Sequence, residues 1–180
     1  MACKSFTLSG IGLGCKDHMG GIKEVYLILE SDVTKIEVTE GAVSAITLAE
    51  SAKFKTYKFR KGTGQMTSTA TSDESVGTFS VQTDLALQFS TMDTAKRMEI
   101  MAMCLESLKG IVLDSNGKYW LLGYDYPISA SAAGAASGLA YADFGGYTVT
   151  LTDNSKEFPY EIPAEVFETI KTNIDAAPVA

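Results

Sequence analysis

The stretch that decides the fold is VGTFSVQTDLALQF, residues 76–89. Large or β-branched residues recur at every second position, and polar residues fill most of the positions between them. This is the period of a β-strand that buries one face and exposes the other. The alternating set consists of Phe79, Val81, Thr83, Leu85, Leu87 and Phe89. We therefore predict one long, half-buried strand here.

The segment before this strand, GTGQMTSTATSDES at residues 62–75, has a different composition. Thr, Ser and Gly dominate it, and Met66 is its only large apolar residue. Because such a segment cannot bury enough apolar surface to offset its ordering entropy, we expect it to order against another chain. With its flanking segments it has the outline of a long β-hairpin, an assembly arm at about residues 53–90. A mobile surface loop is the alternative interpretation.

Composition limits the classes of protein to which the chain can belong. Its 180 residues, 46% hydrophobic and 21% charged, predict a single globular domain over residues 1–180. The formal net charge of −7 argues against sequence-specific nucleic-acid binding. Three cysteines without CxxC spacing predict no disulfide framework, and the absence of a long apolar run predicts no membrane insertion.

The remaining periodic segments predict a mainly β, α+β fold with two helices. The expected strands cover residues 22–29, 33–38, 42–48, 53–61, 111–114, 118–123 and 145–152, with a short edge segment between Pro159 and Pro163. A helix is expected between Asp93 as N-cap and Gly110 as its stop, and a short C-terminal helix begins near Pro163.

The first of these helices carries an apolar stripe, which we predict to face the core. The stripe consists of Ala95, Met98, Met101, Leu105 and Leu108, broadened by Ile100 and Cys104. An adaptable, methionine-rich binding surface is the alternative. Further along, ISASAAGAASGLAYAD at residues 128–143 has side chains too small to fix a conformation, so we predict a flexible loop there.

Candidate catalytic chemistry is sparse. The glycines of SGIGLG at residues 9–14 precede a strand rather than a helix, which argues against a phosphate cradle. Cys15, Asp17 and His18 could supply metal ligands or a nucleophile, but the chain has no second histidine. We predict no enzyme activity, cofactor or metal, and a small hydrolase that uses Cys15 and His18 is the less favoured alternative.

A basic strand, KFKTYKFRK at residues 53–61, contrasts with residues 143–175, where seven acidic residues accompany two lysines. Complementary patches of this kind favour contact between copies of one chain. Single-strand nucleic-acid binding and a solvated face are the alternatives. The subunit-interface candidates are Lys53, Lys55, Lys58, Arg60, Lys61, Gln65, Met66, Thr67, Thr69, Thr71, Phe79 and Val81.

Four stretches carry a family resemblance: CKDHMGGIKEVYLI (15–28), VGTFSVQTDLAL (76–87), DSNGKYWLLGYD (114–125) and GGYTVTLT (145–152). Through these stretches and their spacing, which cover most of the chain, the sequence resembles virion structural proteins of tailed phages of gut Bacteroidales. The order of strands, long arm, strand, helix and hairpin is similar to that of phage tail-tube proteins.

The resemblance implies a β-sandwich or small barrel with a flanking helix, a long extended hairpin arm and a short C-terminal helix. It also implies six copies in a ring and stacked rings that form a tube, whose acidic lumen conducts DNA without sequence recognition. Expected partners are other copies and other tail or virion proteins, in the virion tail after synthesis in the bacterial host cytoplasm. A capsid-decorating or connector-ring protein is the alternative. A generic tube subunit has no counterpart to the segment 128–143.

Overall fold

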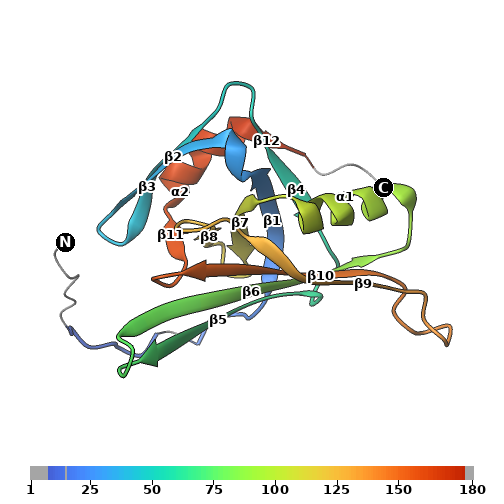
Figure 1. Ribbon diagram of the computed structural model, residues 1–180, viewed down its shortest axis with the longest axis horizontal. Helices are drawn as coiled ribbons and strands as arrows, with labels where there is room; N and C mark the ends of the chain where they lie inside the picture. Colours follow the sequence, from blue (N-terminus) through green and yellow to red (C-terminus); the bar gives the residue numbers. More distant parts are fainter. Residues whose placement is uncertain (1–7, 15, 177–180) are drawn as a thin grey trace.

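Two β-sheets stack on one another and form the body of the molecule (Figure 1). The computed structural model describes residues 8–14 and 16–176. Sheet A has eight strands in the order β12-β4-β1-β7-β8-β11-β3-β2. In chain order these are β1 (Ile22–Leu29), β2 (Val33–Thr39), β3 (Ala42–Leu48), β4 (Phe54–Lys58), β7 (Leu108–Asp114), β8 (Tyr119–Leu122), β11 (Tyr160–Ile162) and β12 (Ile174–Asp175).

Sheet B has four strands in the order β5-β6-β10-β9. Its strands are β5 (Gly64–Asp73), β6 (Thr78–Ser90), β9 (Ser129–Ala136) and β10 (Gly146–Ser155). The helices are α1 (Thr94–Leu105) and α2 (Ala164–Ile170), with 3-10 turns η1 (Glu30–Asp32) and η2 (Lys171–Asn173). This mainly β arrangement of two sheets with two α-helices confirms the predicted fold class.

Strand β1 contributes to two hydrophobic cores because its successive side chains point to opposite faces of sheet A. Val25 and Leu27 lie in the core that sheet B and α1 complete. Tyr26 and Ile28 lie in the second core, which α2 covers on the other face. The predicted central strand 22–29 is confirmed, and its apolar run is that of a strand buried on both sides.

Strand β6 has the alternation that the sequence predicts. Val81, Thr83, Leu85, Leu87 and Phe89 are buried, and the residues between them are exposed or half-buried. The first residue of the set, Phe79, differs, because β6 runs past the end of the core and leaves its ring 53% exposed. Sheet A gives cover only to the part of β6 that lies beneath it (Figure 1).

The predicted arm at 53–90 is divided between the two sheets. Strand β4 pairs with β1 in sheet A, and the chain then turns and forms the hairpin β5–β6 in sheet B. Every residue from Gly64 to Asp73 has a partner on β6. The expectation that this Thr-rich segment orders only against another chain is therefore wrong, because backbone hydrogen bonding to β6 orders it without a core of its own.

The predicted flexible loop 128–143 is also wrong over most of its length. Ser129–Ala136 is strand β9, which pairs with β10 along the edge of sheet B. Small side chains do not prevent pairing, because the exposed edge of β10 supplies the hydrogen-bonding partners. Only the turn that follows β9 lies outside regular structure, and there the Asp143 carboxylate accepts bonds from the backbone N–H groups of Leu139 and Ala140.

Helix α1 begins as predicted and then departs from the prediction. The Asp93 carboxylate accepts a 2.7 Å hydrogen bond from the Lys96 backbone N–H, which confirms the N-cap. The helix ends at Leu105 rather than at Gly110. Gly110 lies inside β7, where a Cβ atom would come within 2.9 Å of the Leu27 side chain. Its lack of a side chain therefore serves packing and not helix termination.

The core-facing side of α1 is not the predicted stripe. Ile100 and Met103 are buried against sheet B. Met98, Met101 and Leu105 face outward. Helical periodicity identifies an apolar stripe on a helix. When one helix carries two such stripes, the tertiary structure decides which of them faces the core.

Other local predictions fare better. The hairpin around Asn116 and Gly117 is confirmed as β7–β8, and the pair 33–38 and 42–48 is confirmed as β2–β3. The segment between Pro159 and Pro163 is strand β11, which lies between β8 and β3 rather than at an edge. Gly146 has a φ of 156°, and a Cβ atom there would lie 2.1 Å from the Phe89 carbonyl oxygen.

A buried carboxylate connects sheet B to the end of β8. Asp153 of β10 is 2% exposed. Burial raises its pKa, a hydrogen bond from the Gly123 backbone opposes that rise, and nearby Asp125 adds to it. Its Oδ1 atom has no hydrogen-bond partner among the described residues. The charged form is therefore disfavoured in the folded chain.

Replacing Leu85 with Ala tests the packing of β6. Leu85 is fully buried, so Leu85→Ala should lower the free energy of unfolding by about 2–5 kcal/mol. The control Gln88→Ala, on the exposed face of the same strand, should change it by less than about 0.5 kcal/mol. Denaturant unfolding followed by circular dichroism measures both, and equal effects would contradict the assigned faces of β6.

Asp153→Asn should become more stabilising, relative to the wild type, as the pH rises from 4 to 7. Because folding raises the pKa of Asp153, this carboxyl group binds more protons in the folded state within this window, and its own contribution to stability falls as the pH rises. Each unit of pKa difference corresponds to about 1.4 kcal/mol. Urea titrations at both pH values measure the trend. The control Glu50→Gln, at an exposed turn, should show no such trend, and a trend of opposite sign for Asp153→Asn would refute the assignment.

Candidate assembly surface

Sheet B has two open edges. Strand β5 pairs with β6 alone, and β9 pairs with β10 alone, among the described residues. All three pairings in the sheet are antiparallel. Four strands that alternate in direction leave the two edge strands antiparallel to each other. When copies are placed side by side in one orientation, β9 of one copy therefore meets β5 of the next as an antiparallel pair.

The β9 edge lacks two of the usual protections against pairing. Its sequence, SASAAGAA, contains no charged residue and no proline, which are the devices that commonly block sheet edges. Residues 131–136 are all exposed. One register irregularity, opposite Thr150 and Leu151, interrupts the ladder with β10. An incoming strand would therefore meet methyl and hydroxymethyl groups only.

The β5 edge is longer and polar. Gln65, Thr67, Thr69 and Thr71 lie on the face that points away from sheet A, because their β6 partners are the exposed members of that strand. Met66 points toward the core instead and packs against it. The strand carries no Lys, Arg or Pro, so this edge also lacks the common blocking residues.

The outward face of sheet B carries no basic group. None of the 15 Lys and Arg residues of the chain lies in the four strands of this sheet. Asp84 lies near the middle of the face and accepts hydrogen bonds from Thr152 Oγ1 at 2.7 Å and from Gln82 Nε2 at 3.1 Å. Asp73 lies at the end of β5, where hydrogen bonds from Ser75 lower its pKa. The face is therefore hydroxyl-rich and weakly acidic.

Three of the five basic interface candidates lie elsewhere and form ion pairs within the chain. Lys53 and Lys55 both form ion pairs with Asp175, at 3.0 and 2.5 Å. Lys58 pairs with Glu24 at 3.2 Å. The structure thus places these lysines on sheet A, away from the Thr-rich face, and gives each of them an acidic partner. The electrostatic attraction that was predicted between basic and acidic patches of different copies is therefore weakened.

The other interface candidates separate by exposure. Arg60 Nε donates to Ser90 Oγ at 3.0 Å and so connects the end of β4 to the end of β6, whereas Lys61 lies in an exposed turn. Phe79 is half-exposed on the outer part of β6. Val81 is fully buried in the chain's own core. Val81 is therefore a packing residue, and the prediction that it lies at a subunit interface is wrong.

Two of the three groups considered for catalysis lie within the described residues, and both are at the surface. Asp17 and His18 are exposed, and Cys15 lies outside the described residues. Among the residues that the structure does describe, no three potential metal ligands come together.

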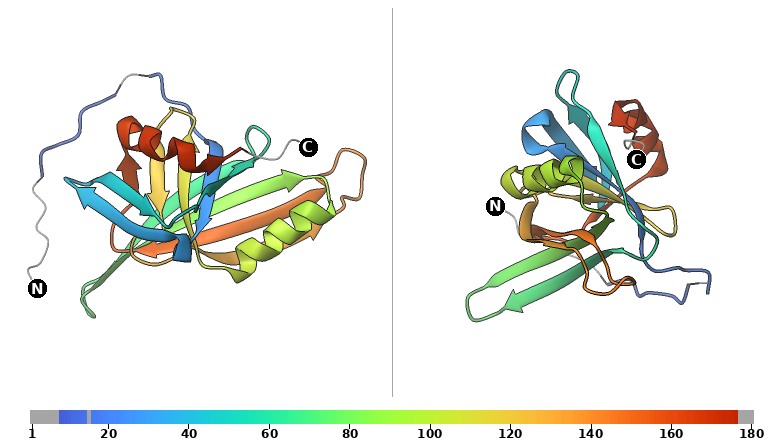
Figure 2. Two further views of the ribbon diagram at one scale, coloured as in Figure 1. Left: turned by 90° about the horizontal axis from the view of Figure 1, so that it is seen from above. Right: turned by 90° about the vertical axis from the view of Figure 1, so that its right-hand side faces the viewer.

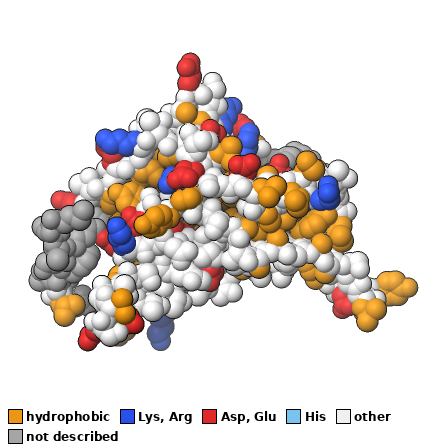
Figure 3. Space-filling model, in the orientation of Figure 1, with side chains coloured by type: hydrophobic (Ala, Val, Ile, Leu, Met, Phe, Trp, Pro, Cys, Tyr) orange, Lys and Arg blue, Asp and Glu red, His pale blue; other side chains and the backbone are white. Residues whose placement is uncertain are grey.

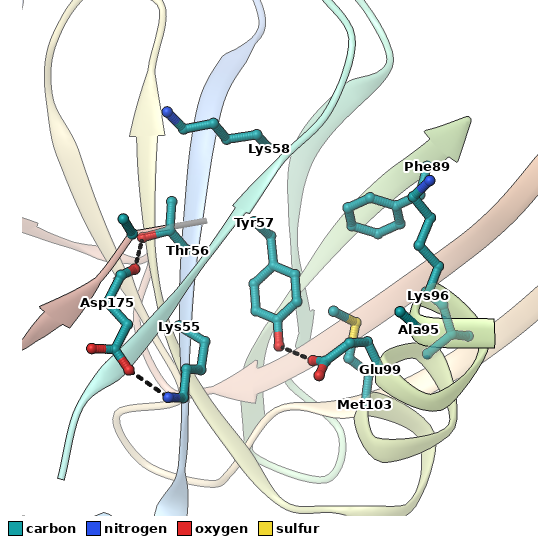
Figure 4. A pocket seen from close by; sticks show the side chains of 12 residues that line it. Lys55, Thr56, Tyr57, Lys58, Phe89, Ala95, Lys96, Glu99, Met103 and Asp175 are labelled. Atoms are coloured by element: carbon teal, nitrogen blue, oxygen red, sulfur yellow. Dashed lines mark hydrogen bonds and ion pairs between the residues drawn. The ribbon is translucent and has the colours of Figure 1, made fainter. Parts of the chain in front are cut away.

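A cavity of about 720 Å³ opens between β4, α1 and β12 (Figure 4). Inside it the Tyr57 hydroxyl donates a 2.8 Å hydrogen bond to Glu99, and the Thr56 hydroxyl donates to the Asp175 backbone carbonyl. Burial is the main cause that raises the pKa of Tyr57, so its phenol remains a donor. Within the part of the chain that the structure describes, no Cys, Ser or His side chain lines the cavity. The polar groups named above form hydrogen bonds with one another and do not form a nucleophile–base pair.

Sequence reasoning located the β5 side of this surface and missed the β9 side. The signal for β9 is present in the sequence, since eight residues without charge, proline or a large side chain are unusual for an exposed edge strand. The same composition is typical of flexible linkers. Only the register with β10 separates the two possibilities.

No protein-family model matches the chain, and neither the curated proteins nor the solved structures contain a match to it. No helix within the described ranges has the length and apolar character needed to cross a membrane. The features of the described chain that bear on its function are the two open edges of sheet B and the charge distribution of its outward face.

Proposed function

We propose that this chain is a noncatalytic structural subunit that assembles edge to edge into rings, and that the stacked rings form the DNA-conducting tube of a phage tail. The observation that carries the proposal is the pair of open, mutually antiparallel edges on one sheet. A contact between two different edges is heterologous. Such a contact closes into a ring when the rotation between copies is a whole fraction of a turn.

The stagger of sheet B supports closure. Strand β9 lies opposite residues 84–90 of β6, and β5 lies opposite residues 78–87. Their midpoints differ by about 4–5 residues, or roughly 15 Å along the strands, and four strands span roughly 19 Å across. Joining the edges at one height therefore inclines the strands by about 40°, within the 35–45° typical of closed β-barrels.

The outward face of sheet B is suited to line the lumen of such a barrel. Its hydroxyl, amide and carboxylate groups offer no cation for a DNA phosphate to bind. The family resemblance supports the same assignment and supplies the six-fold ring, other virion proteins as partners and the virion tail as location. All of the chain's Lys and Arg residues lie outside the four strands of sheet B in the sequence.

Blocking one edge tests the assembly. In the double variant Ala132→Lys/Ala136→Lys, two ammonium groups lie on β9 at the edge that an incoming strand must cover. The wild type should form rings and tubes at high concentration, and this variant should need at least about tenfold more protein, because two charges lose solvation on pairing. Light scattering and negative-stain electron microscopy give the readout.

The matched control is Thr34→Lys/Thr39→Lys, which adds the same charge to exposed positions of β2 at the edge of sheet A. It should assemble like the wild type. A wild-type protein that stays monomeric at every concentration, or an edge variant that assembles as readily as the wild type, would refute the proposal.

The assembled protein should pass DNA without holding it. Sheet B has no basic group. Fluorescence anisotropy should therefore detect no binding of a short labelled DNA duplex to assembled tubes at about 50 mM salt or above. Proteins that bind DNA through its phosphates bind it strongly at about 50 mM salt. Introducing Gln82→Lys and Thr150→Lys on the same face should produce salt-sensitive binding. Tight binding to the wild type would contradict a lumen formed by this face.

A further inference from the structure

Helix α1 has a second apolar stripe that its own chain leaves uncovered. Met98, Met101 and Leu105 are spaced three and four residues apart and are 58%, 45% and 75% exposed. They lie on the side of the helix opposite to the buried Ile100 and Met103. Three large apolar side chains on one exposed stripe are the pattern of an amphipathic helix whose second face contacts a partner.

This outer stripe lies beside the open edge of β9. The element that α1 contacts most is β9, followed by β10. Hydrophobic side chains gather over this part of the molecule, as the space-filling view shows on the right-hand side (Figure 3). A copy that pairs with the β9 edge would therefore come directly against the stripe.

The opposite side of the molecule presents a second uncovered apolar element. Leu8, Ile11 and Leu13 are each about fully exposed, at 99%, 103% and 106%. Their segment, residues 8–14, is otherwise Ser and Gly and carries no charge. It leads toward Ile22, which packs against Gly64 at the start of β5, where a Cβ atom would lie 2.8 Å from the Ile22 side chain. Figure 2 shows this segment and α1 on opposite sides of the body.

We propose that the outer stripe of α1 docks against the N-terminal segment, residues 8–14, of the adjacent copy. The inference rests on the proposed edge-to-edge ring, because pairing β9 of one copy with β5 of the next brings together the sides that carry these two elements. Six large apolar side chains that are exposed to water in the single chain become buried in this contact. Each buries on the order of 100 Å², a useful part of the roughly 800 Å² per partner of a stable interface.

The contact also supplies apolar burial that the pairing of the two edges lacks. Backbone pairing between two strands is marginal in water without apolar side-chain burial. Strand β9 contributes only Ala, Ser and Gly to such a joint. Met is adaptable in shape, and the glycines of segment 8–14 let its backbone approach the helix closely. The helix and the segment therefore supply the apolar area that the edges lack.

Photo-crosslinking tests the contact in the full-length chain. A benzophenone amino acid at position 11 should, after assembly and irradiation, attach to the tryptic peptide 98–109, which contains Met98, Met101 and Leu105. Mixing copies labelled with heavy and light nitrogen separates links between copies from links within one chain. The same probe at Phe158, an exposed aromatic residue on the β10–β11 connection, should not attach to that peptide.

A substitution adds an independent measurement. Met98→Ser/Leu105→Ser removes exposed side chains only, so the monomer should keep its unfolding midpoint while the concentration needed for assembly rises at least tenfold. The control Phe158→Ser should leave assembly unchanged.

The outcomes separate the two proposals. Rings that form normally while the probe at position 11 attaches elsewhere, or only within its own chain, overturn this docking and leave the ring intact. Absence of rings in the wild type overturns the ring itself. Assembly of Met98→Ser/Leu105→Ser at wild-type concentrations also overturns the docking.

Discussion

The one-sided burial of β6 is the constraint on which the rest of the structure depends. Its large side chains fill the core beneath sheet A, and this fixes the register of β5 and β10 on either side. A register shift of one residue in any of these strands would move its buried side chains to the exposed face, so the arrangement is strongly specified. The exposed face of sheet B, with its hydroxyl and carboxylate groups, is therefore a direct result of the core packing on the other face.

Charge is distributed between the two sheets in a way that follows from their burial. Sheet A carries the lysines of β4, and acidic partners from β1 and β12 neutralise them. Sheet B carries no lysine or arginine at all. Exposed ion pairs contribute little to stability. The pairs on sheet A matter mainly because they leave these lysines less available to acidic groups of other molecules. The edges of sheet B, which carry no lysine or arginine, are left as the most readily paired backbone.

The sequence predicted the elements whose patterns are decided locally. The alternation of β6, the Asn-Gly turn before β8 and the cap at Asp93 each have one physical interpretation, and all three are present. It failed where two interpretations compete. Strand β9 has the composition of a linker, and α1 has two apolar stripes, so in both cases a neighbouring element decides the outcome. Part of the candidate surface was accordingly identified from β5, while its other edge required the register of β9.

Gly146 has a consequence for how this sequence can diverge. With its φ of 156° and the Phe89 carbonyl directly in the path of any Cβ atom, this site admits no other amino acid unless the ladder between β6 and β10 is rebuilt. The alanines of β9 from Ala132 onward, by contrast, are exposed. A distant homologue should therefore be recognisable by an invariant glycine at this point, long after the surrounding composition has drifted beyond ordinary similarity.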